Sequence, residues 1–164
     1  MKGELRWMTI TEALIAEHSG FCAVFDCMER ALPSLTTLPE VKVLTGQLEG
    51  MMVGHSEEET DLALVALDHI LAQRGRLDYL HEDHRQMDQL LRRANEAEEF
   101  EQAVHLLKEV LAYSRAHFRH EEEVVFPLID RMLPRNLLEE LGRAWLQRYQ
   151  SSARSTASQA VSQK

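Results

Sequence analysis

The chain has 164 residues, of which 45% are hydrophobic and 27% are charged, and its formal net charge at pH 7 is −9. A chain of this length and apolar content suits one compact domain with its own core. The negative charge argues against binding to nucleic acid and to an anionic membrane, because both favour a basic face. No apolar run reaches the roughly 18 residues of a membrane span, and the N-terminal sequence lacks the apolar core of a signal peptide. We therefore expect a cytoplasmic protein.

The first two predicted elements are helices with recognisable ends. Thr9 and Glu12 have the spacing of a capping box, so the first helix should begin directly after Thr9. It should end before Pro33, because proline lacks the N–H that a helix interior needs. The second helix should begin around Pro39, which is tolerated in a first turn, and run to Gln73.

The second half of the chain repeats this pattern. A third helix is predicted over residues 76–94 and a fourth over residues 98–132, with Pro127 inside it as a kink or the start of fraying. A shorter fifth helix should follow Pro134. The fold class is therefore all-α, as an up-down-up-down four-helix bundle with a short extra C-terminal helix.

The domain prediction follows from the same pattern. Residues 1–150 should form the bundle domain, because they contain all the periodic apolar positions. Residues 151–164 have almost nothing to bury and are expected to form a disordered tail.

Polar side chains interrupt the apolar seam of each main helix. In chain order they are His18, then His55 and Glu59, then His84, then His117 and Glu121. Helical residues four apart point the same way, so each His-x-x-x-Glu pair can act as a two-pronged ligand. The four histidines lie near the middles of the predicted helices, so an antiparallel bundle brings them to one level. The order of a lone His followed by His-x-x-x-Glu occurs twice, which predicts a pseudo-twofold site.

Burying four imidazoles and two carboxylates costs several kcal/mol unless they are paired or coordinated. A bound metal removes this cost. Histidine nitrogen with bridging carboxylate suits iron, manganese or zinc, and two metals about 3.5–4 Å apart are a common way to use two such bridges. The residues alone do not choose the metal.

The motif order, with "EEEVVFP" after the last His, resembles the hemerythrin-like (HHE cation-binding) family over residues 10 to about 133. The resemblance implies a four-helix bundle around two Fe ions, oxo- or hydroxo-bridged and not held in haem, that meet O₂, NO or peroxide. Carried over by position, it implies His18 and His55 on one iron, His84 and His117 on the other, and Glu59 and Glu121 as bridging carboxylates.

The third helix departs from the pattern of the oxygen-carrying hemerythrins. Those proteins have a second His four residues before the helix ligand, where this chain has Leu80. His81, three residues before His84, is either a replacement ligand or a solvated flank residue. The fourth helix has His-x-x-x-Glu where the oxygen carriers have a His and an Asp five apart, so the chain is more similar to the bacterial hemerythrin-like branch.

The remaining titratable residues have plainer interpretations. His69 and His105 fall away from the predicted site, and His120 lies at its edge as a supporting or surface residue. The acidic residues beside the motifs are expected to form solvated faces: Glu57, Glu58, Glu122 and Glu123. Cys22 and Cys27 are too few for a disulfide framework and are not spaced as a CxxC pair, which predicts two reduced, buried thiols.

Three classes of function remain. The favoured one is a di-iron protein that binds or reacts with O₂, peroxide or NO in oxygen or redox sensing or in a stress response. Its apolar neighbours would keep the pocket dry enough for an uncharged gas: Leu14, Phe21, Phe25, Leu80 and Val124. The second is a metal or redox sensor, or an iron store, without turnover, and the third is a helical interaction domain that binds another metal. The sequence leaves open whether the chain is an enzyme.

Overall fold

The computed structural model describes residues 7–66 and 78–162, except for the side chains of residues 78–81 and 151–162. Within those ranges every regular element is a helix. The α-helices are α1 (Ile10–Ala31), α2 (Leu38–Glu59), α4 (Asp78–Glu96), α5 (Phe100–His120), α6 (Phe126–Met132) and α7 (Arg135–Ser162). A 3₁₀ turn, η1 (Leu32–Ser34), follows α1, and two π-helical turns, η2 (Thr60–Leu64) and η3 (Glu121–Val125), follow α2 and α5. No helix among the described residues is both long and apolar enough to cross a membrane.

The start of α1 has the capping box that the sequence predicts. The Glu12 N–H donates to Thr9 Oγ1 at 3.2 Å, and the Thr9 N–H donates to the Glu12 carboxylate at 3.0 Å. Both contacts satisfy backbone groups that the first turn leaves free. The helix ends at Ala31, and Pro33 lies in the 3₁₀ turn that follows, as predicted.

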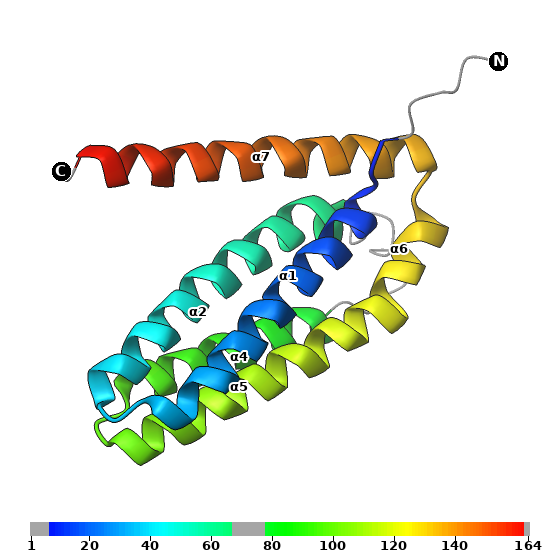
Figure 1. The fold of residues 1–164 in the computed structure, drawn as a ribbon. Helices are drawn as coiled ribbons and strands as arrows, with labels where there is room; N and C mark the ends of the chain where they lie inside the picture. The colour runs from blue at the N-terminus through cyan, green and yellow to red at the C-terminus, as the bar shows by residue number, and fades with distance from the viewer. Residues whose placement is uncertain (1–6, 67–77, 163–164) are drawn as a thin grey trace.

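Figure 1 shows α1, α2, α4 and α5 side by side in a helical bundle, with α7 running across one end of it. Residues 67–77, which include the predicted end of the second helix, lie outside the described residues. The up-down-up-down order therefore stays a prediction.

The core consists of two apolar clusters, one around Phe25, Leu48 and Leu107 and another around Leu14 and Phe126. Along α1, along α2 and η2, and along α5 to α6, the chain passes from one cluster to the other. The predicted site residues of α1, α2, α5 and η3 lie at these crossings, so apolar packing fixes these helices on both sides of them.

The π-helical turn η3 corrects the predicted seam of the fourth helix. In η3 the Phe126 N–H donates to the Glu121 carbonyl, five residues back, which adds one residue to that turn. The residues beyond it are therefore shifted by one position: Val124, expected beside the site, is 46% exposed, and Val125 is 1% exposed. The departure from α geometry lies just before Pro127, and the chain resumes as α6.

The C-terminal helix α7 is longer than predicted. Its backbone is helical through residues 151–162, where we expected a disordered tail. Leu138 and Trp145 are buried against the bundle, as their spacing predicts. A Cβ at Gly142 would overlap the carbonyl oxygen of Met8, so glycine allows α7 to approach the segment that enters α1.

Candidate metal centre

The structure brings six predicted side chains from four helices into the interior. Each has an exposed fraction of 11% or less: His18, His55, Glu59, His84, His117 and Glu121. The lone histidines come from α1 and α4, and each His-x-x-x-Glu pair spans the last turn of α2 or the junction of α5 with η3. His81 lies in α4, but its side chain is outside the described residues.

One group of donor atoms comprises His18, His55 and Glu121. The Nε2 atoms of His18 and His55 are 3.1 Å apart, and Glu121 Oε2 lies 3.5 Å from His18 Nε2. The three donor atoms lie within 4.8 Å of one another, close enough to hold one metal ion together.

A second group comprises Glu59, His84, His117 and Glu121, also within 4.8 Å of one another. His84 Nε2 lies 3.2 Å from Glu59 Oε2, and His117 Nε2 lies 2.8 Å from Glu121 Oε1. Glu121 is the member common to both groups, with Oε2 facing His18 and Oε1 facing His117.

Carboxylates contact the other ring nitrogen of three histidines. The pairs are His55 Nδ1 with Glu17 (2.9 Å), His18 Nδ1 with Glu122 (3.0 Å) and His117 Nδ1 with Asp83 (3.8 Å). Glu17 and Glu122 lie within hydrogen-bond distance of Nδ1, whereas Asp83 is too far from His117 for a hydrogen bond. A carboxylate that accepts from Nδ1 orients the ring and leaves Nε2 as the ligand nitrogen. Burial lowers the pKa of His55, but the Glu17 hydrogen bond and the nearby carboxylates together raise it by more, so the pKa of His55 lies above its ordinary value.

These three carboxylates were not predicted as part of the site. Glu122 was expected in a solvated run; it is 38% exposed but bonds to His18. Glu17, Asp83 and Glu122 each directly adjoin a predicted site residue in sequence, and each serves a histidine on another helix. Their position next to site residues in the sequence could have indicated these carboxylates. Which histidine each one contacts depends on how the helices are rotated against one another.

Several buried donor and acceptor atoms at the centre have no hydrogen-bond partner among the described residues. They are both carboxylate oxygens of Glu59 and of Glu121, His84 Nε2, and both ring nitrogens of His117. Some lie within 4 Å of each other, but their geometry does not make hydrogen bonds. Buried polar atoms that converge without bonding are costly. Their arrangement fits a cation between them.

The histidines differ in their preferred charge. Burial and the neighbouring His55 lower the pKa of His18 to about 3, which keeps its imidazole neutral. Burial also opposes protonation of His84, but the carboxylates of Glu121 and Glu59 outweigh it and raise the pKa to about 10. Neutral imidazole is the form that binds metal, so a cation would replace the proton on His84.

The pKa values of the two buried carboxylates, Glu59 and Glu121, are shifted in opposite directions. Burial and the charge of Glu121 raise the pKa of Glu59. Burial also acts to raise the pKa of Glu121, but contacts with His117 and His84 reverse it and hold this pKa well below its ordinary value. Two carboxylates this close repel each other, and a bound cation would relieve that repulsion.

Aromatic rings cover the histidine pair of the first group. The Phe118 ring stacks on His18 with a centroid distance of 3.9 Å, and the Phe21 ring meets His55 edge-on at 5.3 Å. Leu14 and Phe25 are fully buried in the apolar clusters on either side. Leu80 has no described side chain.

The remaining histidines and the two cysteines belong to neither donor group among the described residues. His105 is 73% exposed and pairs with Glu109 on the same helix, as expected of an ordinary surface residue. His69 lies outside the described residues, and His120 is half-buried. Both cysteines are free, but the prediction that they are buried is wrong: Cys22 is half-buried, and Cys27 is exposed and accepts from Arg30.

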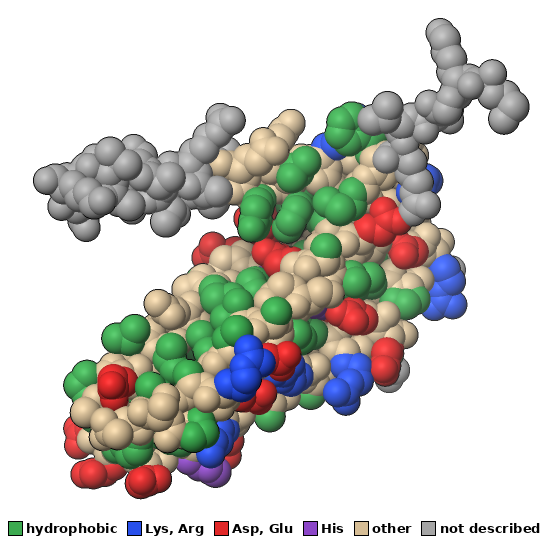
Figure 2. Space-filling view, in the orientation of Figure 1, with side chains coloured by type: hydrophobic (Ala, Val, Ile, Leu, Met, Phe, Trp, Pro, Cys, Tyr) green, Lys and Arg blue, Asp and Glu red, His purple; other side chains and the backbone are tan. Residues whose placement is uncertain are grey.

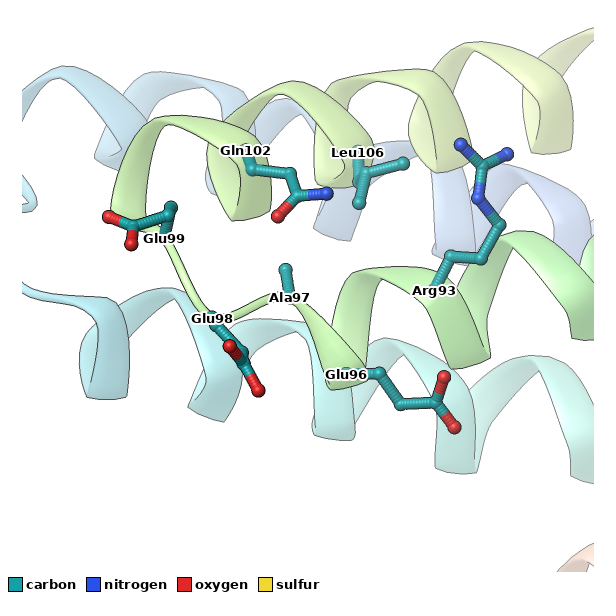
Figure 3. Close-up of a pocket in the computed structure, with 7 residues that line it drawn as sticks. All are labelled: Arg93, Glu96, Ala97, Glu98, Glu99, Gln102 and Leu106. Atoms are coloured by element: carbon teal, nitrogen blue, oxygen red, sulfur yellow. The ribbon is translucent and has the colours of Figure 1, made fainter.

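An acidic group at the turn between α4 and α5 provides a contrast. Glu96, Glu98 and Glu99 line a shallow pocket there with Arg93. Figure 3 shows their carboxylates pointing away from one another, so they do not converge on a cation.

The model of the hemerythrin HHE cation binding domain matches this chain over residues 9–129 and again over residues 75–150. No curated protein and no solved structure matches it. The first match contains all six clustered side chains, and the two together span well over half of the chain. The chain therefore belongs to the hemerythrin HHE cation-binding domain family.

Proposed function

We propose that this chain is a cytoplasmic non-haem di-iron protein, built on an up-down-up-down four-helix bundle, that binds or reacts with O₂, NO or peroxide. The observation that carries the proposal is the position of Glu121, whose two oxygens face two separate groups of imidazole and carboxylate donors. A carboxylate shared in this way suits a pair of metal ions.

The site residues would be distributed between two metal ions. His18 and His55 would hold one ion, His84 and His117 would hold the other, and Glu121 would bridge them. Glu59 would join the second ion, because it belongs to that donor group alone. The sequence prediction of Glu59 as a second bridge has less support from these distances.

Two irons would supply reversible one-electron chemistry and a place for a small ligand. The protein would orient the imidazoles of His55 and His18 through hydrogen bonds to Glu17 and Glu122. Phe21 and Phe118 would exclude water from the His18 and His55 side. An uncharged molecule such as O₂ or NO suits a site whose surroundings are apolar.

The test is the metal content of protein expressed with iron available, measured by plasma emission together with the aerobic absorption spectrum. About two irons per chain, near-ultraviolet bands and a spectral change on adding azide are the expected results. A colourless protein that holds zinc, or no metal, would contradict the proposal and favour a helical interaction domain.

Iron-loaded protein then separates an enzyme from a carrier. Added peroxide should release O₂ over many turnovers if the chain is an enzyme. Stoichiometric, reversible binding of O₂ or NO would indicate a carrier or sensor.

A redox sensor or iron store is the second candidate, and one contact favours the sensor. Glu17 holds His55 at 2.9 Å and also lines a pocket under α7, so a change at His55 has a direct route to the C-terminal helix. Reduced and oxidised protein should then differ in oligomer size or in protease sensitivity near α7. Identical behaviour in both states would count against a sensor.

A further inference from the structure

A pocket of about 470 Å³ lies between α1, α2 and α7. Its walls include Phe21 from α1, Met51 from α2, and Trp145 and Tyr149 from α7. Figure 2 shows hydrophobic side chains gathered where α7 meets the bundle. The volume falls in the range of small-molecule sites, about 300–1,000 Å³.

The pocket has a distinctive chemical character. Three of its lining residues are aromatic, and Trp145 and Tyr149 stack on each other with a centroid distance of 5.2 Å. Glu17 is the one charged residue among those that line it, and its side chain is 12% exposed. A single carboxylate among apolar and aromatic walls is complementary to a ligand with an apolar ring and one positive charge.

The charges around the pocket support a cationic ligand. The side chain of Arg148, the nearby cation on α7, pairs with Asp61 at 3.0 Å.

We propose that this pocket binds a small aromatic amine. The ring of the amine packs against Phe21, Met51 and Trp145, and its ammonium group donates to Glu17. Glu17 Oε2 already accepts from His55, so the ammonium group meets a carboxylate that also orients the candidate metal centre. Binding of the amine does not require the metal, so the proposal stands independently of the proposed di-iron function.

The test uses tryptophan fluorescence in a Trp7→Phe background, where Trp145 is the one remaining tryptophan. Metal-free and metal-loaded protein are titrated with 2-phenylethylamine, with the neutral 2-phenylethanol and with the anionic 3-phenylpropionate. The expected result is saturable quenching or enhancement by the amine, at least tenfold weaker binding of the alcohol, and no saturation with the acid.

Two glycines provide a matched pair of variants. A Cβ at Gly20 and a Cβ at Gly46 would each have no described atom within 4 Å, so both positions accept a larger side chain. Gly20 lines the pocket and Gly46 does not. Gly20→Leu should abolish the saturable response, and Gly46→Leu should leave it unchanged.

Equal affinity for the amine and the acid would overturn the proposal, as would an unchanged response in Gly20→Leu or no saturation with any of the three compounds. If metal-free protein binds the amine but holds no iron after loading, the pocket proposal stands and the di-iron proposal fails.

Discussion

Glu121 is the residue on which both donor groups depend, because Oε2 faces His18 while Oε1 faces His117. Glu59 belongs to one group alone. We therefore expect Glu121→Gln, which keeps the side-chain volume, to lose both metals. Glu59→Gln should lose about half of the bound metal, because only the second donor group is changed. Plasma emission on the purified variants, with metal reported per chain, measures the difference.

Glu123→Gln is the control for that pair, since Glu123 is an exposed residue in the same acidic run and belongs to neither donor group. It should keep the full metal content. Equal loss in Glu59→Gln and Glu121→Gln would mean that both carboxylates bridge, as the family resemblance implies.

The carboxylates on the Nδ1 atoms should affect metal binding without touching the metal. Glu17→Gln keeps a hydrogen-bond acceptor near His55 but removes the charge that favours Nδ1–H as the donor. Loss of such a partner lowers metal affinity by about 10- to 100-fold. Competition with a chromophoric chelator measures this change.

Glu57→Gln, at an exposed position of α2, is the control for Glu17→Gln and should retain the metal affinity of the unchanged chain. An unchanged affinity in Glu17→Gln would show that packing against Phe21 is sufficient to hold the His55 ring.

At the scale of the elements, periodicity predicted the helices but missed the π-helical turns. Caps and prolines identified the start of α1 and of α2 to within a residue. A π-helical turn carries no reliable residue signature, so a seam drawn at three- and four-residue steps continues to Val124, while the structure buries Val125. One π turn begins directly after Glu59 and the other begins at Glu121, so both adjoin the glutamate of a His-x-x-x-Glu pair, which associates them with the site.

The site was more predictable than its surroundings for a related reason. On α2 and on α5, the clustered residues lie before the π turn that follows the helix or at its first residue, where the helical periodicity still holds. His18 and His84 lie within regular α-helices. The supporting contacts of Glu17, Asp83 and Glu122 are made between helices, and a single sequence does not give the rotation of one helix against another.

The crossing of α7 over the start of α1 depends on Gly142. A methyl group there would overlap the Met8 carbonyl oxygen, so Gly142→Ala must push the two segments apart. We expect a loss of about 1–3 kcal/mol in the free energy of unfolding, the usual cost of overpacking. Urea denaturation monitored by circular dichroism measures it.

The same substitution at Gly46 is the matched control, because a Cβ there meets no described atom within 4 Å. Gly46→Ala should stabilise the protein by up to about 1 kcal/mol, the difference in helix propensity. If both variants gained stability, the close approach of α7 to Met8 would not persist in solution.

At the scale of the whole molecule, metal binding and folding should be linked. The centre has buried atoms without a hydrogen-bond partner among the described residues, and they lie between the two apolar clusters: those of Glu59, His84, His117 and Glu121. A metal bound there stabilises the folded chain and not the unfolded one. Metal at a hundred times its Kd adds about 2.7 kcal/mol per site.

For a chain of this size each kcal/mol corresponds to about 2–4 °C in Tm. Removing the metal with a chelator should therefore lower the Tm by several degrees, as measured by calorimetry. Glu121→Gln should melt at the same temperature with and without chelator. A Tm that does not respond to chelator in the unchanged chain would place the metal outside the folded core.

The pocket under α7 and the candidate metal centre share Glu17, and a shared residue couples two sites reciprocally. An ammonium group on Glu17 competes with His55 Nδ1–H and adds positive charge near a bound cation, so saturating 2-phenylethylamine should weaken metal binding. By linkage, bound metal should weaken the binding of the amine by the same factor, within the usual range of about 5- to 150-fold.

Chelator competition gives the factor for metal binding, and Trp145 fluorescence in the Trp7→Phe background gives the factor for amine binding. Gly20→Leu should remove the effect of the amine on metal affinity, and two clearly unequal factors in the unchanged chain would show that the amine acts somewhere other than at Glu17.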